Sequence, residues 1–229
     1  MFFFYDWTLL IVLPALILAL YAQAKVSGTF NRFSKVYARS GLTAAQAADA
    51  ILSQNGITDV RIERVRGNLT DHYDPRDRVL RLSDSVYDST SIAALGVAAH
   101  EAGHAVQHAQ GYVPLEVRSV FAPIASIGSN AAIPLFLLGL IFSWEPLVTV
   151  GLVCFSFAVV FALITLPVEF NASSRAVAAL SGYGYLSQEE TAGAKKVLSA
   201  AALTYVASAL TAILQLVRLF VLAGRSNRD

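Results

Sequence analysis

The stretch that decides the fold is Ala98-Ala99-His100-Glu101-Ala102-Gly103-His104-Ala105-Val106-Gln107. It lies within Ile92–Gly111, whose composition and length predict one helix. Residues four apart lie on the same face of a helix, so His100 and His104 can present two imidazole nitrogens to one ion. Glu101 follows His100 directly and would stand beside the remaining coordination position.

Two histidines and an adjacent carboxylate form the donor pattern of a zinc peptidase. Zinc lowers the pKa of a water molecule, and the carboxylate takes the proton of that water. The alternative is a buried helix that contains two histidines by chance. The chain has only four histidines, and two of them stand at this spacing around a glutamate. The pattern therefore favours a site for one zinc ion, with Glu101 as the general base.

A catalytic zinc ion usually has a third protein ligand. His108 continues the series, but eight residues span about 12 Å of helix axis while zinc–nitrogen bonds are about 2.1 Å. We therefore expect His108 to be a hydrogen-bonded helix histidine or a rim residue. Glu169 is the better candidate, because a carboxylate at the end of an uncharged apolar run needs a partner. The alternative for Glu169 is a solvated carboxylate paired with Arg175.

The composition is that of a membrane protein. Of 229 residues, 55% are hydrophobic and only 14% are charged, which is too apolar for an ordinary soluble domain. The net charge of +1 gives no electrostatic argument for nucleic-acid binding. The single cysteine, Cys154, excludes a disulfide within the chain and disfavours a cysteine-based zinc site.

Four apolar stretches are long enough to cross a hydrocarbon core of about 30 Å. They are Trp7–Ala24, Ala122–Phe142, Pro146–Leu166 and Val197–Leu222. The first has no basic start and no clear cleavage site, so we expect an uncleaved anchor. The second and third are joined only by Ser143-Trp144-Glu145, which predicts a tight hairpin. In the fourth, Arg218 is near the end, where its side chain could snorkel to the interface.

Positive charge predicts the orientation. The side that carries the motif is rich in cations near the segment ends, whereas the opposite side has only Arg225 and Arg228, at the C-terminus. The cations on the motif side are Lys25, Arg32, Lys35, Arg39, Arg118, Arg175, Lys195 and Lys196. We therefore expect a multi-pass protein of the bacterial plasma membrane with its catalytic side in the cytoplasm. The residues after the third segment, 167–196, return to the side of the motif and can supply the third ligand.

The polar portion, Lys25–Leu115, predicts a small α+β unit. Thr43 to Gln46 form a capping-box pattern that opens a helix, which ends at Asn55-Gly56. Strands are expected at Val60–Val65 and Val79–Leu82, with turn residues in Gly67–Asp77 between them. Ser89 or Thr90 is the candidate N-cap of the motif helix. The whole chain, 1–229, is then a single membrane-embedded domain, mainly α, with about four transmembrane helices and a zincin-like helix-plus-β-ribbon unit.

The strand before the motif helix could serve peptide binding. An exposed β edge can take up an extended peptide as one more strand. The alternative is a ribbon that only packs over the helix, and the sequence favours neither.

The chain resembles the bacterial membrane-bound neutral zinc metallopeptidases of the YugP-like group. The likeness covers nearly the whole chain and rests on its segment order and on several motifs together. These motifs are Ala98–Gln107, Val168-Glu169-Phe170-Asn171-Ala172-Ser173, Ser40-Gly41-Leu42-Thr43 and Asn68–Arg76. The resemblance implies a gluzincin-type peptidase, distantly similar to the heat-shock membrane zinc proteases and the prenyl-protein proteases. In that wider pattern an Asp four residues after the Glu ligand supports a zinc histidine. Here Ser173 takes that place, and Asn171 or Ser173 would give weaker support.

The expected activity is hydrolysis of peptide bonds at the membrane surface, in peptides or membrane proteins. An additional group must stabilise the oxyanion, and the candidates are His72, Tyr73, Arg76 and Arg175. The rival hypothesis is a non-enzymatic scaffold or chaperone-like protein with a structural metal, which would need a fourth ligand such as His108. Small residues in the second and fourth apolar segments would suit close helix contacts within an oligomer.

Overall fold

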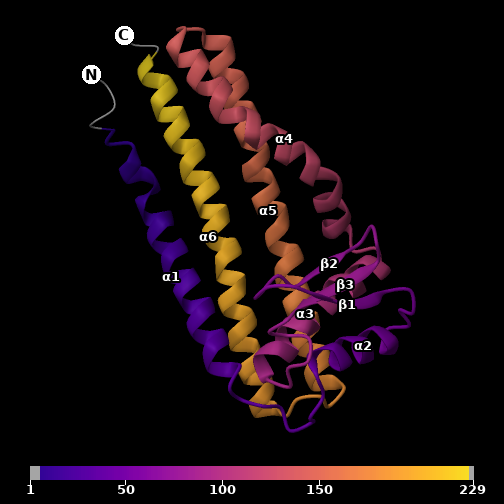
Figure 1. Cartoon of the computed structure of the whole chain (residues 1–229). Coiled ribbons are helices and arrows are strands. Elements are labelled where there is room, and N and C mark those ends of the chain that lie inside the picture. Colours follow the sequence, from indigo (N-terminus) through magenta and orange to yellow (C-terminus); the bar gives the residue numbers. More distant parts are fainter. Residues whose placement is uncertain (1–5, 227–229) are drawn as a thin grey trace. The chain divides into compact units, whose positions relative to one another are not determined.

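The computed structural model describes residues 6–226 (Figure 1). Contacts divide the chain into two compact units, which are described separately. The polar unit comprises residues 23–115 and 168–203, and the apolar unit comprises the remaining described residues. In chain order the elements are α1 (Leu9–Phe33), α2 (Ala44–Gln54), β1 (Arg61–Val65), β2 (His72–Asp74), β3 (Val79–Ser83), α3 (Ile92–Ala109), α4 (Val113–Ile141), α5 (Glu145–Gly182) and α6 (Gln188–Ser226).

The sheet of the polar unit has three strands in the order β1-β3-β2. β1 runs parallel to β3, with Arg61 opposite Val79, and β2 runs antiparallel to β3, with His72 opposite Arg81. The two expected strands are present, but β2 forms within the stretch in which only turn residues were expected. Because β3 has a neighbour on each side, it offers no free edge, and of the two alternatives left open for this strand the binding of a peptide at its edge is excluded. The free edges belong to β1 and β2.

Helices α2 and α3 pack together, and α3 also contacts β2 and β3. The buried apolar residues between these elements include Ile51, Leu80 and Leu95. The capping box at Thr43 and Gln46 is confirmed, with both side-chain-to-backbone hydrogen bonds present.

The N-cap expected for the motif helix was wrong. It is neither Ser89 nor Thr90 but Ser91, whose hydroxyl accepts a hydrogen bond from the backbone N–H of Ala94. Ser89 Oγ instead donates to Ser91 Oγ. Both neighbouring serines are cap formers by type, and only the backbone conformation decides which of them caps.

The described chain has four helices that are long and apolar enough to cross a membrane: α1, α4, α5 and α6. All four begin or end several residues beyond the expected apolar stretches, because polar ends continue the same helices. The largest difference is in α5, which continues through Pro167 to Gly182 instead of ending at Leu166. The residue expected as third ligand, Glu169, is therefore held on a helix.

Glycines allow close packing in the apolar unit. A Cβ at Gly139 would lie 2.6 Å from the Val148 backbone, and one at Gly151 would lie 2.7 Å from the Phe136 backbone. Helices α4 and α5 therefore approach each other along a tight hairpin, as the three-residue connection predicted.

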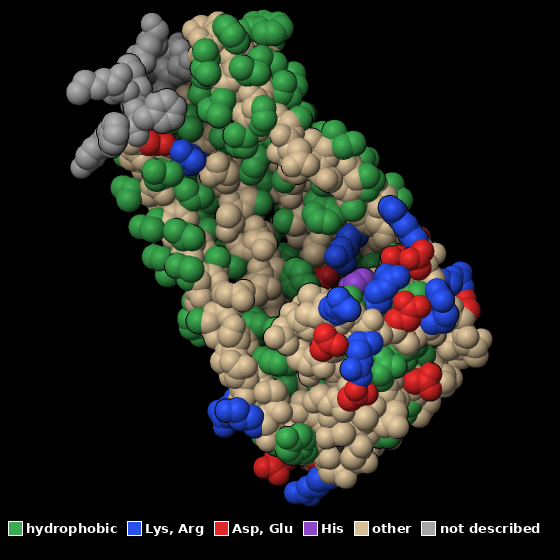
Figure 2. Space-filling model, in the orientation of Figure 1, with side chains coloured by type: hydrophobic (Ala, Val, Ile, Leu, Met, Phe, Trp, Pro, Cys, Tyr) green, Lys and Arg blue, Asp and Glu red, His purple; other side chains and the backbone are tan. Residues whose placement is uncertain are grey.

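Arg218 of α6 has partners within the apolar unit. Its Nη2 donates to Asp6 Oδ2 at 2.6 Å and its Nε to Thr8 Oγ1 at 3.1 Å, so snorkelling is not needed to explain this cation. Figure 2 shows that hydrophobic side chains cover the surface of the long helices, whereas most charged side chains in this view lie over the sheet.

Candidate metal centre

Three donor side chains converge within the polar unit. His100 and His104 are one turn apart on α3, and Glu169 comes from α5. Glu169 Oε2 lies 3.2 Å from His100 Nε2 and 3.6 Å from His104 Nε2. One donor atom from each residue lies within 4.8 Å of the other two. Donor atoms bound to one zinc ion at about 2.1 Å each are at most about 4 Å apart. The two distances to Glu169 lie within this limit, and the 4.8 Å bound for the whole group lies slightly above it, so a small movement of the side chains would suit one ion.

The close approach of α3 to α5 depends on Gly103, which lies between the two histidines. A Cβ at this position would stand 2.8 Å from the carbonyl oxygen of Ala172. Even alanine would therefore push α3 away from α5. Glycine at this place lets the backbone of α5 come near enough for Glu169 to reach both imidazoles.

The three side chains are largely withdrawn from solvent. The exposed fractions are 3% for the Glu169 side chain, 12% for His100 and 11% for His104. Glu169 is therefore not a solvated carboxylate, which was the alternative to a ligand role. A buried anion beside two imidazoles is stabilised by a cation, and the His₂Glu set is a known zinc donor set. The residues present thus fit zinc.

Burial lowers the pKa of His104, but the hydrogen bond to Glu169 and the negative charge of Glu101 outweigh burial, so that the pKa is raised above the usual value of a histidine. The same negative potential would attract a metal cation.

Gln107 fixes which nitrogen of His104 is available. The Gln107 Nε2 group donates to Val168 O and to Asn171 Oδ1, both at 2.9 Å. Its Oε1 therefore faces His104 Nδ1 at 3.0 Å, and as an acceptor it requires a proton on that nitrogen. The lone pair of His104 is then on Nε2, the nitrogen that points to Glu169.

Arg175 anchors this chain of hydrogen bonds. Its Nε donates to Asn171 Oδ1 at 2.7 Å. Because arginine can only donate, the atom of Asn171 that it contacts must be the oxygen, which then also accepts from Gln107. Arg175 Nη1 donates a hydrogen bond to Gln110 Oε1 at 2.6 Å. Arg175 and Asn171 thus act on the orientation of His104 through Gln107.

Sequence reasoning missed Gln107. The side chain is fully buried, although glutamine is usually exposed. The signal was available, since Gln107 stands three residues after His104 and so on the same face of the helix. His100 has a simpler partner: Ser173 Oγ lies 3.1 Å from its Nδ1. Ser173 therefore lies where weak support for a histidine was expected.

A hydrogen bond from a strand of the sheet holds the Glu101 carboxylate. The backbone N–H of Tyr73, in edge strand β2, donates to Glu101 Oε2 at 3.0 Å. The Tyr73 hydroxyl lies 2.8 Å from Nδ1 of His108, so His108 is a hydrogen-bonded helix histidine, as expected from the helix geometry. His108 does not belong to the donor group.

The remaining candidates are further from the donors. His72 is exposed, and its Nδ1 lies 2.9 Å from Thr70 O. Arg76 lies in an exposed turn, where its backbone N–H is bonded to Asp74 Oδ1. No described hydrogen bond joins His72 or Arg76 to the three donors.

Fold and site together define a helical protein with four long apolar helices and an HExxH-plus-Glu donor set. The chain belongs to the family described as "Putative neutral zinc metallopeptidase", whose model matches residues 8–224. The resemblance noted from the motifs is thereby confirmed. The chain is also similar to "Putative membrane protease YugP" of Bacillus subtilis (strain 168), with 49% identity over 219 residues, which are 96% of this chain and 97% of the relative. No solved structure matches the chain.

Proposed function

We propose that the protein is a membrane-bound, zinc-dependent peptidase that hydrolyses peptide bonds near the membrane surface. The observation that carries this proposal is the convergence of His100, His104 and Glu169 on one point, with Glu101 next to it on α3. The family and the relative named as a membrane protease support the same reading.

The residues of the site have different proposed roles. His100, His104 and Glu169 would hold the ion, and Gln107 and Ser173 orient the imidazoles. When bound, zinc supplies an electrophile that polarises a carbonyl group and lowers the pKa of water. Glu101 accepts a proton from the attacking water and later delivers it to the leaving amine.

The hydrogen bond from Tyr73 keeps the Glu101 carboxylate in place and brings edge strand β2 beside it. A peptide substrate could pair with this edge by strand addition, so this mode of binding is now proposed for β2 and not for β3. Tyr73 is the strongest of the four proposed oxyanion or substrate contacts, because it alone touches the general base. His72 and Arg76 stay candidates for substrate contact, and Arg175 acts on Asn171 and Gln110.

The rival, a structural metal in a non-enzymatic scaffold, is less well supported. A structural zinc ion usually has four protein ligands. The donor group found among residues 6–226 has three, and His108 is bonded to Tyr73 instead. A position is thus left for water and substrate.

We further propose that the chain is a multi-pass protein of a bacterial plasma membrane, with the site on the cytoplasmic side. The four apolar helices and the positive charges near the site support this placement. The test is an Asn68→Cys variant, placed on an exposed loop, in a Cys154→Ala background. An impermeant thiol reagent should label it only after the cells are opened. Labelling of intact cells would reverse the orientation.

The function is tested with purified full-length protein in detergent. Wild type, Glu101→Gln and the control Glu189→Gln, at an exposed position of α6, are compared for zinc content and for cleavage of denatured casein. Glu101→Gln should keep one zinc ion and lose about 10²- to 10⁴-fold in rate, the range of a general base. The control should match wild type. Normal cleavage by Glu101→Gln would refute the assigned role, and one zinc ion without any cleavage by wild type would favour the structural-metal scaffold.

A further inference from the structure

A cavity apart from the candidate metal centre lies in the polar unit. It is formed by the C-terminal part of α1 and the N-terminal part of α6. Its volume is about 650 Å³, within the usual range for ligand sites. Each helix contributes one stripe with the spacing i, i+3, i+4, i+7, together with the ring of Phe33. The stripes are Lys25, Gly28, Thr29 and Arg32 on α1, and Ala192, Lys195, Lys196 and Ser199 on α6.

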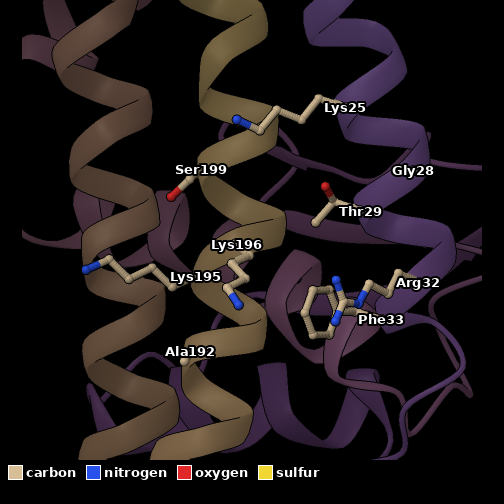
Figure 3. A pocket seen from close by; sticks show the side chains of 9 residues that line it. All are labelled: Lys25, Gly28, Thr29, Arg32, Phe33, Ala192, Lys195, Lys196 and Ser199. Atoms are coloured by element: carbon tan, nitrogen blue, oxygen red, sulfur yellow. The ribbon is translucent and has the colours of Figure 1, made fainter.

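The cavity is strongly basic. It is lined by four cations and no acidic residue. Figure 3 shows Lys25 reaching from α1 toward α6, Arg32 and Phe33 together beside α1, and Lys195 pointing away from α1. The ion pairs of the described residues include none to Arg32, Lys195 or Lys196. Like charges brought together repel one another, and an anion bound between them would reduce that cost.

The remaining lining residues suit a phosphate group. Thr29 and Ser199 are hydroxyl residues on the two helices, and Figure 3 shows Thr29 on the side of α1 that faces α6, whereas the Ser199 hydroxyl points away from α1. Gly28 and Ala192 leave room, and a Cβ at Gly28 would meet nothing within 4 Å. Several cations, the hydroxyl of Thr29 and an open space at Gly28 match the negative oxygens of a phosphate ester.

The position of the cavity along the chain indicates where the phosphate comes from. The cavity begins at Lys25, directly after the apolar stretch Trp7–Ala24, and Lys195 and Lys196 directly precede the apolar stretch Val197–Leu222. Both halves of the cavity therefore mark the ends of apolar helix segments, where lipid head groups lie. Basic pockets between transmembrane helices are typical binding sites for anionic lipid head groups.

We propose that this cavity binds the phosphate head group of one anionic phospholipid. Lys25, Arg32 and Lys196 hold the phosphate, and Thr29 donates a hydrogen bond to it. The proposal does not depend on zinc or on peptidase activity.

The test uses the full-length protein in a non-ionic detergent and native mass spectrometry. The added probes are dioleoylphosphatidylglycerol, dioleoylphosphatidylcholine and inorganic phosphate. We expect one phosphatidylglycerol per chain, with no retained phosphatidylcholine. Arg32→Gln/Lys196→Gln should weaken phosphatidylglycerol binding by about 25-fold, from about fivefold per cation. The control Lys35→Gln/Arg66→Gln removes two exposed cations outside the cavity and should leave binding unchanged.

A variant that leaves the charge unchanged distinguishes binding in the cavity from general electrostatic attraction of the lipid to the cations. Gly28→Leu keeps every cation and projects a side chain into open space, so the fold should be kept while the cavity is filled. It should reduce phosphatidylglycerol binding as strongly as the double variant. Equal loss in the control variants, unchanged binding by Gly28→Leu, or equal retention of phosphatidylcholine would each overturn the proposal. Saturation by inorganic phosphate with exclusion of the lipid would overturn the lipid source and indicate a soluble phosphorylated ligand.

Discussion

Two ionisable side chains stand within or directly after an apolar stretch of a long helix, Arg218 on α6 and Glu169 on α5. The groups that surround them are different. Arg218 meets an opposite charge, Asp6, and a hydroxyl, Thr8, so that its charge is neutralised within the protein. Glu169 is more deeply buried, and the groups that face it include two imidazoles. The first arrangement is an ion pair with a hydroxyl beside it, whereas the second brings together three donor side chains that suit a metal ion. The comparison distinguishes a charge within an ion pair from a charge grouped with two other metal donors.

The largest expected effect is at Glu169. Glu169→Gln keeps the shape but removes the negative charge, so zinc affinity should fall by more than about 100-fold, beyond the loss typical for outer hydrogen-bond partners. Zinc content after dialysis should drop from one ion per chain toward none. Glu189→Gln is the matched control. Full zinc occupancy of Glu169→Gln would place the third ligand elsewhere.

Removal of the ion should destabilise the wild type. At an ion concentration of about 1,000 times Kd, binding contributes about 4 kcal/mol, which corresponds to roughly 10 °C in Tm for a chain of this size. Melting with and without EDTA measures the effect. Glu169→Gln should show no such shift. If the Tm of the wild type changes neither with EDTA nor with added zinc, the proposal that the protein binds the ion is contradicted.

Gln107→Leu should weaken zinc binding by about 10- to 100-fold, because His104 loses the acceptor that keeps the proton on Nδ1. Ser173→Ala should have a smaller effect, since a hydroxyl can donate or accept and so does not fix the tautomer of His100. Competition with a fluorescent zinc chelator measures both variants. Equal effects of the two changes would show that Gln107 has no special part in orienting His104.

The smallest effect is expected at the ion pair of Arg218 and Asp6. Arg218→Gln should lower stability by about 1–2 kcal/mol, the size of a charged hydrogen-bonded contact. Asp6→Asn in the same chain should recover part of that loss. Zinc content should be unchanged in both, measured beside Tm. A loss of zinc in Arg218→Gln would remove the distinction between the two charged positions.

Local patterns predicted much of this molecule. The helical spacing of His100 and His104, the capping box at Thr43 and the four apolar stretches are all short-range signals, and each is present in the structure. Glu169 was also found from sequence, because a lone carboxylate ending an apolar run is conspicuous.

The features that were missed depend on contacts between distant residues. Strand β2 forms among turn residues because β3 offers it a partner, and nothing in 72–74 alone indicates this pairing. Helix α5 continues through Pro167, a residue that removes one hydrogen bond and usually predicts a helix end. Gln107 is informative only once Val168 and Asn171 are known to face it.

Gly103 has a consequence for the choice of metal. Its missing side chain sets the separation of two backbones, and that separation sets the size of the triangle formed by the donor atoms. Ions of different radius need triangles of different size. Position 103 is therefore a place where a change of one methyl group could shift the preference among divalent ions while every donor atom stays the same.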